Sequence, residues 1–185
     1  MKKTKITKII VITGAGSGIG RETARLFLNN DYKVALIGRK SETLIKTANN
    51  NKNAMILPCD VSDYTKVNKT FLKIYKKYKR IDILFNNAGI SKKSGTIDEI
   101  SVKDWTEVVN TNLLGSYYCA REVFKIMRLQ KPQGGRIINN GSISSHSPRP
   151  LSSSYTSTKH AITGLTKSIS LDGRKFNIAC CQIDI

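Results

Sequence analysis

Two tyrosines in the sequence are each followed by a lysine four positions later. The pairs are Tyr75 with Lys79 and Tyr155 with Lys159. A free phenol has a pKa of about 10 and exchanges protons poorly at neutral pH, but a neighbouring ammonium group favours the phenolate and lowers that pKa. Because side chains four residues apart share one face of a helix, either pair could act as a general acid and base.

A serine lies thirteen positions before each of these tyrosines, at Ser62 and Ser142. A serine hydroxyl can donate a hydrogen bond to a substrate oxygen whose charge changes during the reaction. Ser62 begins the helical pattern that carries the first tyrosine, which separates the two groups by about 20 Å along the helix. Ser142 instead follows a strand-like stretch, and a proline-containing loop can return the chain beside it. We therefore predict that Ser142, Tyr155 and Lys159 form one catalytic group.

A glycine-rich segment follows the first apolar run of the chain. Glycines let the backbone turn tightly and approach a pyrophosphate, whose charge is stabilised by free amides and by the positive end of a following helix. The spacing differs from the common G-x-G-x-x-G fingerprint, because an isoleucine stands where the third glycine would be. A loop with only a structural role is the alternative. We predict that dinucleotide phosphates bind along Gly14, Ser17, Gly18, Ile19 and Gly20.

The end of the second predicted strand should decide which dinucleotide binds. An acidic side chain at this place would bond the ribose hydroxyls of NAD. The sequence has Arg39 and Lys40 instead, and no carboxylate occurs before Glu42. A guanidinium group suits a 2′-phosphate through a planar, charge-assisted contact. We predict NADP in preference to NAD, and the alternative is that Arg39 and Lys40 are ordinary surface cations.

Short apolar runs alternate with amphipathic helical patterns along the whole chain. Runs that are apolar on both faces and separated by helices predict a parallel sheet covered on both sides. Right-handed crossovers then give a doubly wound (Rossmann) α/β fold of about six strands, with ligands at the carboxyl ends of the strands. We expect one domain over 1–185. The predicted strands are 8–13, 33–37, 54–58, 81–85, 136–140 and 177–183.

The formal net charge of +18 is spread along the chain. Such a charge governs non-specific association more than fold or chemistry. The densest basic run, 66–80, has apolar residues at helical spacing, which predicts a surface helix with a solvated basic side. We therefore expect no nucleic-acid partner, and a basic nucleic-acid binder remains as an alternative function.

The cysteine spacing argues against a zinc-binding protein, and the length of the apolar runs argues against a membrane-spanning one. The four cysteines lack the close pairs of a zinc site, so we expect no metal. They are typical of core residues in a reducing cytoplasm. No run approaches the roughly 18 apolar residues of a membrane-spanning helix, so we expect no membrane partner.

Together these motifs resemble the short-chain dehydrogenase/reductase family, and in particular its 3-oxoacyl-[acyl-carrier-protein] reductases. The glycine-rich segment is similar to the T-G-x-x-x-G-x-G turn of that family, and the serine, tyrosine and lysine occur in the family order. The resemblance extends over nearly the whole chain. A further match to the family's N-N-A-G signature is formed by Asn86, Asn87, Ala88 and Gly89.

The resemblance implies a role for each matching residue. Tyr155 would be the general acid in reduction and the base in oxidation, Lys159 would also bind the nicotinamide ribose, and Ser142 would polarise the carbonyl. Asn112 would relay protons; a helix-bending or capping role is the alternative. The remaining cofactor contacts would come from Asp60 near the adenine, Val61, Asn87, Ala88 and Gly89.

The predicted function is hydride transfer between NADP(H) and a carbonyl or secondary alcohol, such as a small ketone, an aldehyde or a 3-oxoacyl thioester. A homodimer or homotetramer is expected by resemblance, and an acidic acyl carrier protein is compatible with the positive charge. Members of the family continue beyond the sixth strand, so we expect this chain to lack their last strand and substrate-covering segment. The alternative function is a non-catalytic nucleotide sensor or scaffold with the same fold.

Overall fold

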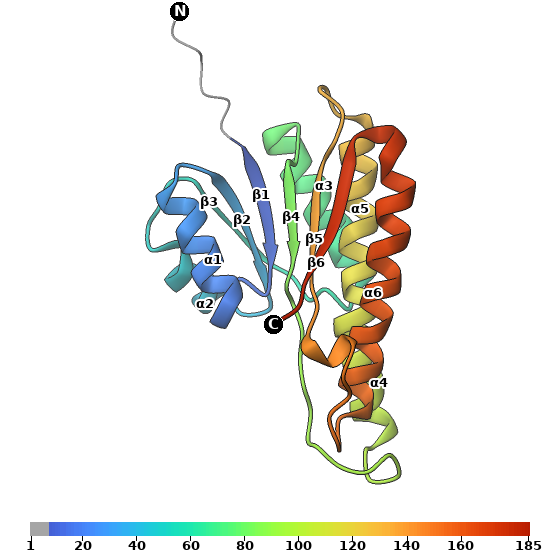
Figure 1. The fold of residues 1–185 in the computed structure, drawn as a ribbon. Helices are drawn as coiled ribbons and strands as arrows, with labels where there is room; N and C mark the ends of the chain where they lie inside the picture. Colours follow the sequence, from blue (N-terminus) through green and yellow to red (C-terminus); the bar gives the residue numbers. More distant parts are fainter. Residues whose placement is uncertain (1–7) are drawn as a thin grey trace, which may run out of the picture.

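The computed structural model describes residues 8–185, so residues 1–7 of the predicted domain 1–185 lie outside the described part. The centre of the molecule is a parallel sheet of six strands in the order β3-β2-β1-β4-β5-β6 (Figure 1). The chain changes direction across the sheet between β3 and β4, which confirms the predicted doubly wound α/β fold. The strands are β1 (Ile9–Thr13), β2 (Lys33–Gly38), β3 (Ala54–Pro58), β4 (Ile83–Asn86), β5 (Gly135–Asn140) and β6 (Ile178–Ile183).

The largest difference from the predicted strand bounds is in β4, which begins at Ile83 rather than at position 81. The backbone of Ile81 is paired with a side chain instead of a neighbouring strand. Its amide donates to Gln130 Oε1 over 2.9 Å, and its carbonyl accepts from Gln130 Nε2 over 3.0 Å. A contact between residues so far apart in the sequence cannot be detected from apolar periodicity.

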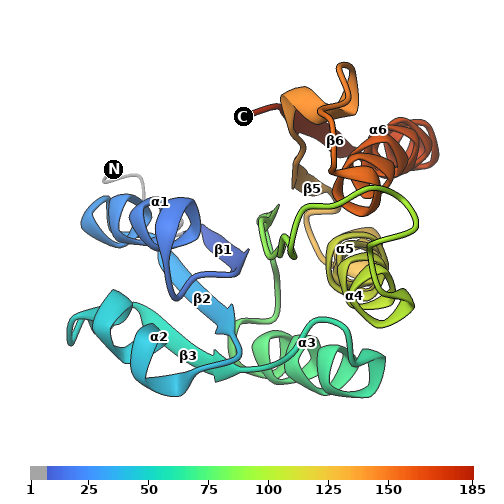
Figure 2. The same cartoon turned by 90° about the horizontal axis from the view of Figure 1, so that it is seen from below.

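Helices cover both faces of the sheet. In Figure 2, α1 and α2 lie on one side of the sheet, and α3, α5 and α6 lie on the other. The helices are α1 (Gly18–Asn29), α2 (Ser41–Ala48), α3 (Tyr64–Tyr78), α4 (Val102–Val108), α5 (Gly115–Leu129) and α6 (Ser153–Gly173). A π-helical turn, Val109–Leu114, joins α4 to α5, and 3-10 turns cover Ile143–Ser145 and Arg174–Phe176.

The central strands are buried on both sides because successive side chains point to opposite faces of a sheet. In β1, Val11 packs in one core with Phe71 of α3 and Val123 of α5. Its neighbours Ile10 and Ile12 pack in a second core with residues of α1 and α2. This arrangement explains why the strands are continuous apolar runs in the sequence.

The basic run at 66–80 lies in α3, as predicted, and its apolar side is buried. Asp63 caps the helix by accepting a hydrogen bond of 3.0 Å from the amide of Lys66. Lys79 lies beyond the end of α3 in the left-handed conformation, with a φ of 62°. Tyr75 and Lys79 therefore do not form a one-turn pair on a helix, and Ser62 lies before the other end of the same helix.

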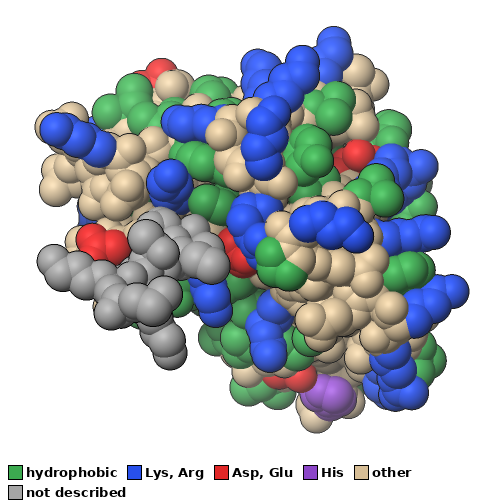
Figure 3. Space-filling model, turned by 90° about the horizontal axis from the view of Figure 1, so that it is seen from above, with side chains coloured by type: hydrophobic (Ala, Val, Ile, Leu, Met, Phe, Trp, Pro, Cys, Tyr) green, Lys and Arg blue, Asp and Glu red, His purple; other side chains and the backbone are tan. Residues whose placement is uncertain are grey.

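Lysine and arginine side chains are distributed over the end of the molecule at which the strands begin (Figure 3). Helices that connect parallel strands run opposite to them, so the helices end on this side. Basic residues occupy the last turns of α2, α3 and α5. Cations at helix C-termini are stabilised by the helix dipole, so part of the positive charge has a structural role.

Within residues 8–185, no helix is long and apolar enough to cross a lipid bilayer. The described part of the chain also contains no group of three or more His, Cys, Asp or Glu side chains placed to hold a metal ion. All four cysteines are free thiols.

Candidate active site

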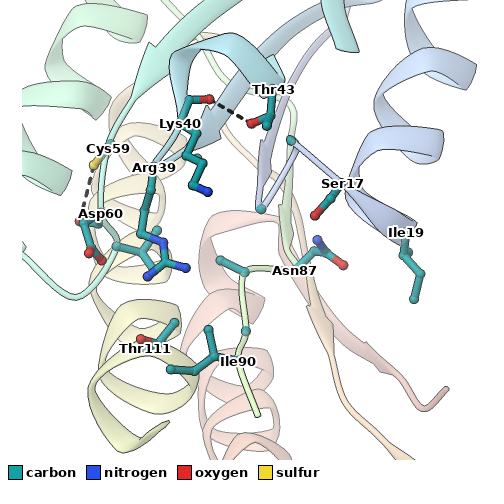
Figure 4. Close-up of a pocket in the computed structure, with 16 residues that line it drawn as sticks. Ser17, Ile19, Arg39, Lys40, Thr43, Cys59, Asp60, Asn87, Ile90 and Thr111 are labelled. Carbon is teal, nitrogen blue, oxygen red and sulfur yellow. Dashed lines mark hydrogen bonds between the residues drawn. The ribbon is translucent and has the colours of Figure 1, made fainter. Parts of the chain in front are cut away.

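A cavity of about 540 Å³ lies at the carboxyl ends of β1 to β4, at the point where the chain changes direction across the sheet (Figure 4). This is the position at which doubly wound folds bind their ligands. Gly18 and Gly20 belong to the turn beside the cavity, and Tyr155 and Lys159 lie outside its lining. Nine of the predicted cofactor residues line it: Gly14, Ser17, Ile19, Arg39, Asp60, Val61, Asn87, Ala88 and Gly89.

The turn between β1 and α1 requires glycine at several positions. Gly14 and Gly18 have φ angles of 66° and 50°, which residues other than glycine rarely adopt. A Cβ atom on Gly14 would lie 2.9 Å from Asn87 Nδ2, and one on Gly20 would collide with the carbonyl of Gly14. A side chain at either position would therefore displace the turn or Asn87.

The first turn of α1 leaves its amides available. Ser17 occupies the N-cap position, but its hydroxyl makes no capping hydrogen bond, and no acidic side chain lies in the first turn. The amides at a helix N-terminus have no partner within the helix and attract anions together with the helix dipole. Arg21 Nε donates to the carbonyl of Gly16 over 3.1 Å and closes the turn. This geometry suits a pyrophosphate.

Thr13 and Asn87 connect the glycine turn to the end of β4. The Thr13 hydroxyl accepts hydrogen bonds of 2.9 Å from the amides of Asn87 and Ala88. Asn87 Nδ2 donates to the carbonyl of Thr13 over 3.0 Å, and Asn140 Nδ2 donates to Asn87 Oδ1 over 2.9 Å. The network ties three neighbouring strand ends, β1, β4 and β5, into one rigid edge. Thr13 is the first residue of the predicted T-G-x-x-x-G-x-G turn, whereas Asn140 was not predicted to belong to the site.

Arg39 and Lys40 extend from the end of β2 toward the cavity (Figure 4). Both side chains are exposed, as is Glu42 in the first turn of α2. Asp60 follows the end of β3 and also lines the cavity. One of its oxygens accepts from the amide of Ser62 over 3.0 Å and from the Ser62 hydroxyl over 2.8 Å. The cavity rim beside β2 therefore carries positive charge.

Tyr155 and Lys159 lie one turn apart in α6, as predicted. Lys159 Nζ lies 5.4 Å from the centre of the Tyr155 ring and donates to the carbonyl of Asn140 over 2.7 Å. Burial lowers the pKa of Lys159 to about 8, and the negative charge of Asp184 opposes this effect. The structure thus places a buried amine, which titrates near neutral pH, beside a phenol.

Ser142 lies two residues beyond the end of β5 and is buried. Its hydroxyl accepts a hydrogen bond of 3.2 Å from the amide of Ser144 and donates to the carbonyl of Ile185 over 3.4 Å. The turn Ile143–Ser145 packs against α6, the helix that carries Tyr155. The second predicted set of serine, tyrosine and lysine is therefore brought to one edge of the sheet, whereas the first set is not.

The sequence profile of the short chain dehydrogenase family matches residues 8–184. The chain belongs to this family. It is 34% identical to a 3beta-hydroxysteroid dehydrogenase of Mediterraneibacter gnavus over 95% of its own length and 64% of that protein. The chain thus spans somewhat less than two thirds of this curated relative.

Two solved structures illustrate the similarity. ElxO with NADP bound is 37% identical and superposes with a TM-score of 0.90 over 97% of this chain and 73% of that one. A 3-ketoacyl-(acyl-carrier-protein) reductase from Brucella melitensis in complex with NADH is 27% identical, with a TM-score of 0.92 over 96% of this chain and 74% of that one. One relative was thus solved with each of the two dinucleotides.

Asn112 lies in the π-helical turn between α4 and α5. Its buried amide group pairs with the backbone of Ile90: Oδ1 accepts from the amide over 2.8 Å, and Nδ2 donates to the carbonyl over 2.9 Å. Nδ2 also lies 3.4 Å from the Thr158 hydroxyl on α6. Asn112 therefore connects the segment after β4 to the helix that carries Tyr155 and Lys159.

Both histidines of the chain are exposed. His160 Nδ1 lies 3.0 Å from the carbonyl of Thr156 in its own helix. His146 Nε2 lies 3.0 Å from Asp184 Oδ2. Sequence reasoning did not identify Asp184, because a single acid after a predicted strand has no partner within a short sequence window.

Proposed function

We propose that this chain is an oxidoreductase that transfers hydride between a nicotinamide dinucleotide and a carbonyl or secondary alcohol. The observation that carries the proposal is the position of Lys159, which is buried beside the Tyr155 ring. Its amine donates a hydrogen bond to the carbonyl of Asn140 at the end of β5, and this strand end is bonded through Asn87 to the start of the glycine turn. Family membership supports the same reaction class. The substrate range that we propose is a small ketone, an aldehyde or a 3-oxoacyl thioester.

The residues around the cavity fit a dinucleotide. Side chains at Gly14, Gly16 or Gly20 would collide with Asn87, Thr43 or the Gly14 carbonyl, so only glycine keeps the turn in this shape. The uncapped first turn of α1 offers amides to the charge of a pyrophosphate. Asp60 and Val61 would lie near the adenine, and Asn87, Ala88 and Gly89 would border the ribose and nicotinamide. When bound, the nicotinamide supplies or accepts the hydride.

The proton steps are assigned to side chains of this chain. Tyr155 donates its hydroxyl proton to the carbonyl oxygen during reduction and takes it back during oxidation. The Lys159 ammonium stabilises the phenolate that remains, and Ser142 donates a hydrogen bond to the oxygen as negative charge develops on it. We assign Asn112 to the proton relay; its buried contact with Ile90 beside α6 supports this role.

We infer a preference for NADP over NAD from the cations beside the cavity. Arg39 and Lys40 follow β2 at the place where the 2′ position of the adenosine ribose would lie. A guanidinium group can form two charge-assisted hydrogen bonds to a phosphate. The complex of ElxO with NADP supports this preference, whereas the NADH complex of the Brucella reductase shows that relatives with this fold also bind NADH.

We propose that the protein forms homodimers or homotetramers and acts on a small-molecule substrate. A 3-oxoacyl thioester would reach it on an acyl carrier protein, for which the name of the Brucella melitensis relative provides support. The excess of lysine and arginine suits an acidic carrier. The four free cysteines support a reducing compartment such as the cytoplasm.

The test is a fluorescence titration of the purified, folded chain with NADPH and NADH, followed by NADPH oxidation with a panel of ketones, aldehydes and 3-oxoacyl thioesters. We expect tighter binding of NADPH. Tyr155→Phe should lower turnover by about 100-fold or more and keep NADPH affinity, since it removes only the transferable proton. Tyr75→Phe is the matched control and should keep both. NADPH binding without turnover by the wild type would favour the nucleotide-sensing alternative, and absence of binding would reject the proposal.

A further inference from the structure

The amide of Ser142 lies just beyond the end of the β5–β6 ladder. The last paired residues are Asn140 and Ile183, and the amide of Gly141 donates to the carbonyl of Ile183 over 2.8 Å. The next amide, that of Ser142, has no strand residue to accept from it. It donates instead to Asp184 Oδ1 over 2.9 Å, with Ser145 Oγ as a second acceptor at 3.3 Å. A side-chain carboxylate thus replaces the missing ladder partner of a buried residue.

The same carboxylate contacts the whole turn that follows β5. Asp184 Oδ1 also lies 3.4 Å from the Ser145 hydroxyl and accepts from Gln182 Nε2 over 2.7 Å. Asp184 Oδ2 lies 3.0 Å from His146 Nε2. Three residues of the turn 142–146 therefore bind one side chain, that of Asp184, which follows the last residue of β6.

The backbone makes room for this carboxylate. Gly141 separates β5 from Ser142, and a Cβ atom added to it would overlap Asp184 Oδ1 and crowd Gln182. The φ angle of Gly141 is not in the left-handed region, so the glycine is required for space and not for its backbone conformation. Gly141 and Asp184 are thus complementary in shape, independently of the hydrogen bonds.

We infer that Asp184 is a positioning residue for Ser142: its carboxylate holds the turn 142–146 so that the Ser142 hydroxyl stays where it can bond the substrate oxygen. The inference rests on the proposed function, because it is the proposed reaction that gives Ser142 its task. A carboxylate that binds the backbone amide, the Ser145 hydroxyl and the His146 ring restricts the turn from three sides. Positioning of this kind contributes to rate because small displacements of a hydrogen-bond donor weaken it at the transition state.

The charge of Asp184 also acts on the neighbouring amine. The titratable groups that face Asp184 are His146 on the turn and Lys159 on α6, and Tyr155 lies beside Lys159. Burial acts to raise the pKa of Asp184, but hydrogen bonds from Gln182, His146 and the Ser142 amide lower it below its usual value. The carboxylate is therefore ionised at neutral pH, and its charge favours the cationic form of Lys159.

The experiment compares Asp184→Ala and Asp184→Asn with Asp172→Asn, an equal charge change at an exposed site on α6. Amide hydrogen exchange measured by NMR in the folded chain reports on Ser142 without any need for turnover. We expect exchange at Ser142 to quicken by about tenfold or more in Asp184→Ala, as loss of one hydrogen bond to a charged group implies. It should stay unchanged in Asp172→Asn. If Asp184→Ala does not fold, Asp184→Leu carries the same comparison, because it keeps a side chain of similar length and removes both acceptor oxygens.

Kinetics then separate positioning from plain structural support. With NADPH and a ketone substrate, we expect kcat of Asp184→Ala to fall about 10-fold or more while the Kd for NADPH changes less than about twofold, because Asp184 is not among the residues that line the cavity. Asp184→Asn should move the alkaline limb of the kcat profile to lower pH, since loss of the negative charge lowers the pKa of Lys159 further.

An unchanged Ser142 exchange rate, or an unchanged kcat in an active enzyme, would overturn the inference. A wild-type chain that binds no dinucleotide or shows no turnover would instead refute the proposed function. In that case the exchange comparison alone decides whether Asp184 holds Ser142. The two failures are thus distinguishable.

Discussion

Lys159 Nζ donates a hydrogen bond of 2.7 Å to the backbone carbonyl of Asn140, and this contact joins α6 to the end of β5. Asn140 in turn donates from its side chain to Asn87, which is bonded to Thr13 at the start of the glycine turn. The proposed proton-transfer pair and the proposed phosphate site are therefore connected by three hydrogen-bonded strand ends. A shift of one strand end would change the position of the amine relative to the dinucleotide site.

Lys159→Met should change the pH dependence of stability. The folded pKa of Lys159 is about 8, below the value of about 10.4 in an unfolded chain. Between these values the unfolded chain binds more protons than the folded one, so the free energy of unfolding of the wild type should rise with pH across this window. The methionine variant lacks this contribution. Denaturant unfolding of both chains at about pH 7.0 and about pH 9.5 gives the change in unfolding free energy with pH for each chain.

Lys167→Met is the matched control, because Lys167 is exposed on the same helix. Its unfolding free energy should follow the wild-type pH dependence. The Lys159→Met chain should also lose carbonyl reduction while remaining folded. Parallel pH profiles for wild type and Lys159→Met would show that burial does not shift the pKa of Lys159.

Gly20→Ala should disturb the phosphate site. The added Cβ atom would collide with the carbonyl of Gly14 and approach Asn87 Nδ2, so the turn must shift. We expect a loss of about 1–3 kcal/mol in unfolding free energy, as overpacking commonly gives, and a NADPH affinity at least about tenfold weaker. Calorimetric or fluorescence titration and chemical unfolding check the two effects.

Gly164→Ala provides the contrasting substitution. Gly164 lies in α6, and nothing would meet its Cβ atom within 4 Å. Alanine is favoured over glycine in helices, so stability should increase by about 0.5–1 kcal/mol with unchanged NADPH affinity. Equal behaviour of the two alanine variants would contradict the steric argument.

Arg39→Ala should reduce discrimination between the two dinucleotides. The exposed guanidinium group at the cavity rim is expected to contact only the 2′-phosphate, so its removal should weaken NADPH binding by about 10- to 100-fold and leave NADH binding nearly unchanged. Titrations of both dinucleotides give the ratio of dissociation constants. Lys52→Ala, an exposed cation in the turn before β3, serves as the control for net charge. An unchanged ratio in Arg39→Ala would refute the assignment.

Glu122→Gln should weaken the contact between α3 and α5. The buried Glu122 carboxylate accepts hydrogen bonds from the Tyr64 hydroxyl over 3.1 Å, from Asn68 Nδ2 over 3.0 Å and from Lys125 Nζ over 2.9 Å. We expect a loss of about 2 kcal/mol in unfolding free energy, because an amide cannot satisfy three donors as a carboxylate does. Chemical unfolding of wild type and Glu122→Gln at about pH 7 measures this loss of unfolding free energy.

The pH dependence gives a second check on Glu122. Burial acts to raise its pKa, but hydrogen bonds from Lys125, Tyr64 and Asn68 lower it below the usual value. A depressed folded pKa adds stability above the unfolded pKa of about 4.3, and this stability is lost as the pH falls through the folded pKa. The difference between wild type and Glu122→Gln should therefore shrink in acid. Glu42→Gln, an exposed control, should show neither effect.

The sequence by itself determined the fold class and pointed to nine of the residues that line the cavity. Continuous apolar runs such as 33–37 indicate strands buried on both faces, because only a sheet covered by helices on both sides excludes water from every side chain. The glycines at 14, 18 and 20 indicated a tight turn, because no other residue tolerates its backbone angles and contacts. Helical distance alone excluded Ser62 as a partner of Tyr75.

Only the tertiary structure decided which side chains support the site. Asn140 and Asp184 act through contacts with residues 19 and 42 positions away in the chain, and no local pattern encodes such contacts. The depressed pKa of Lys159 likewise arises from burial under elements that meet only after the sheet has formed. Local periodicity specifies which residues enter the core, whereas hydrogen bonds at strand ends depend on how the strands are placed side by side.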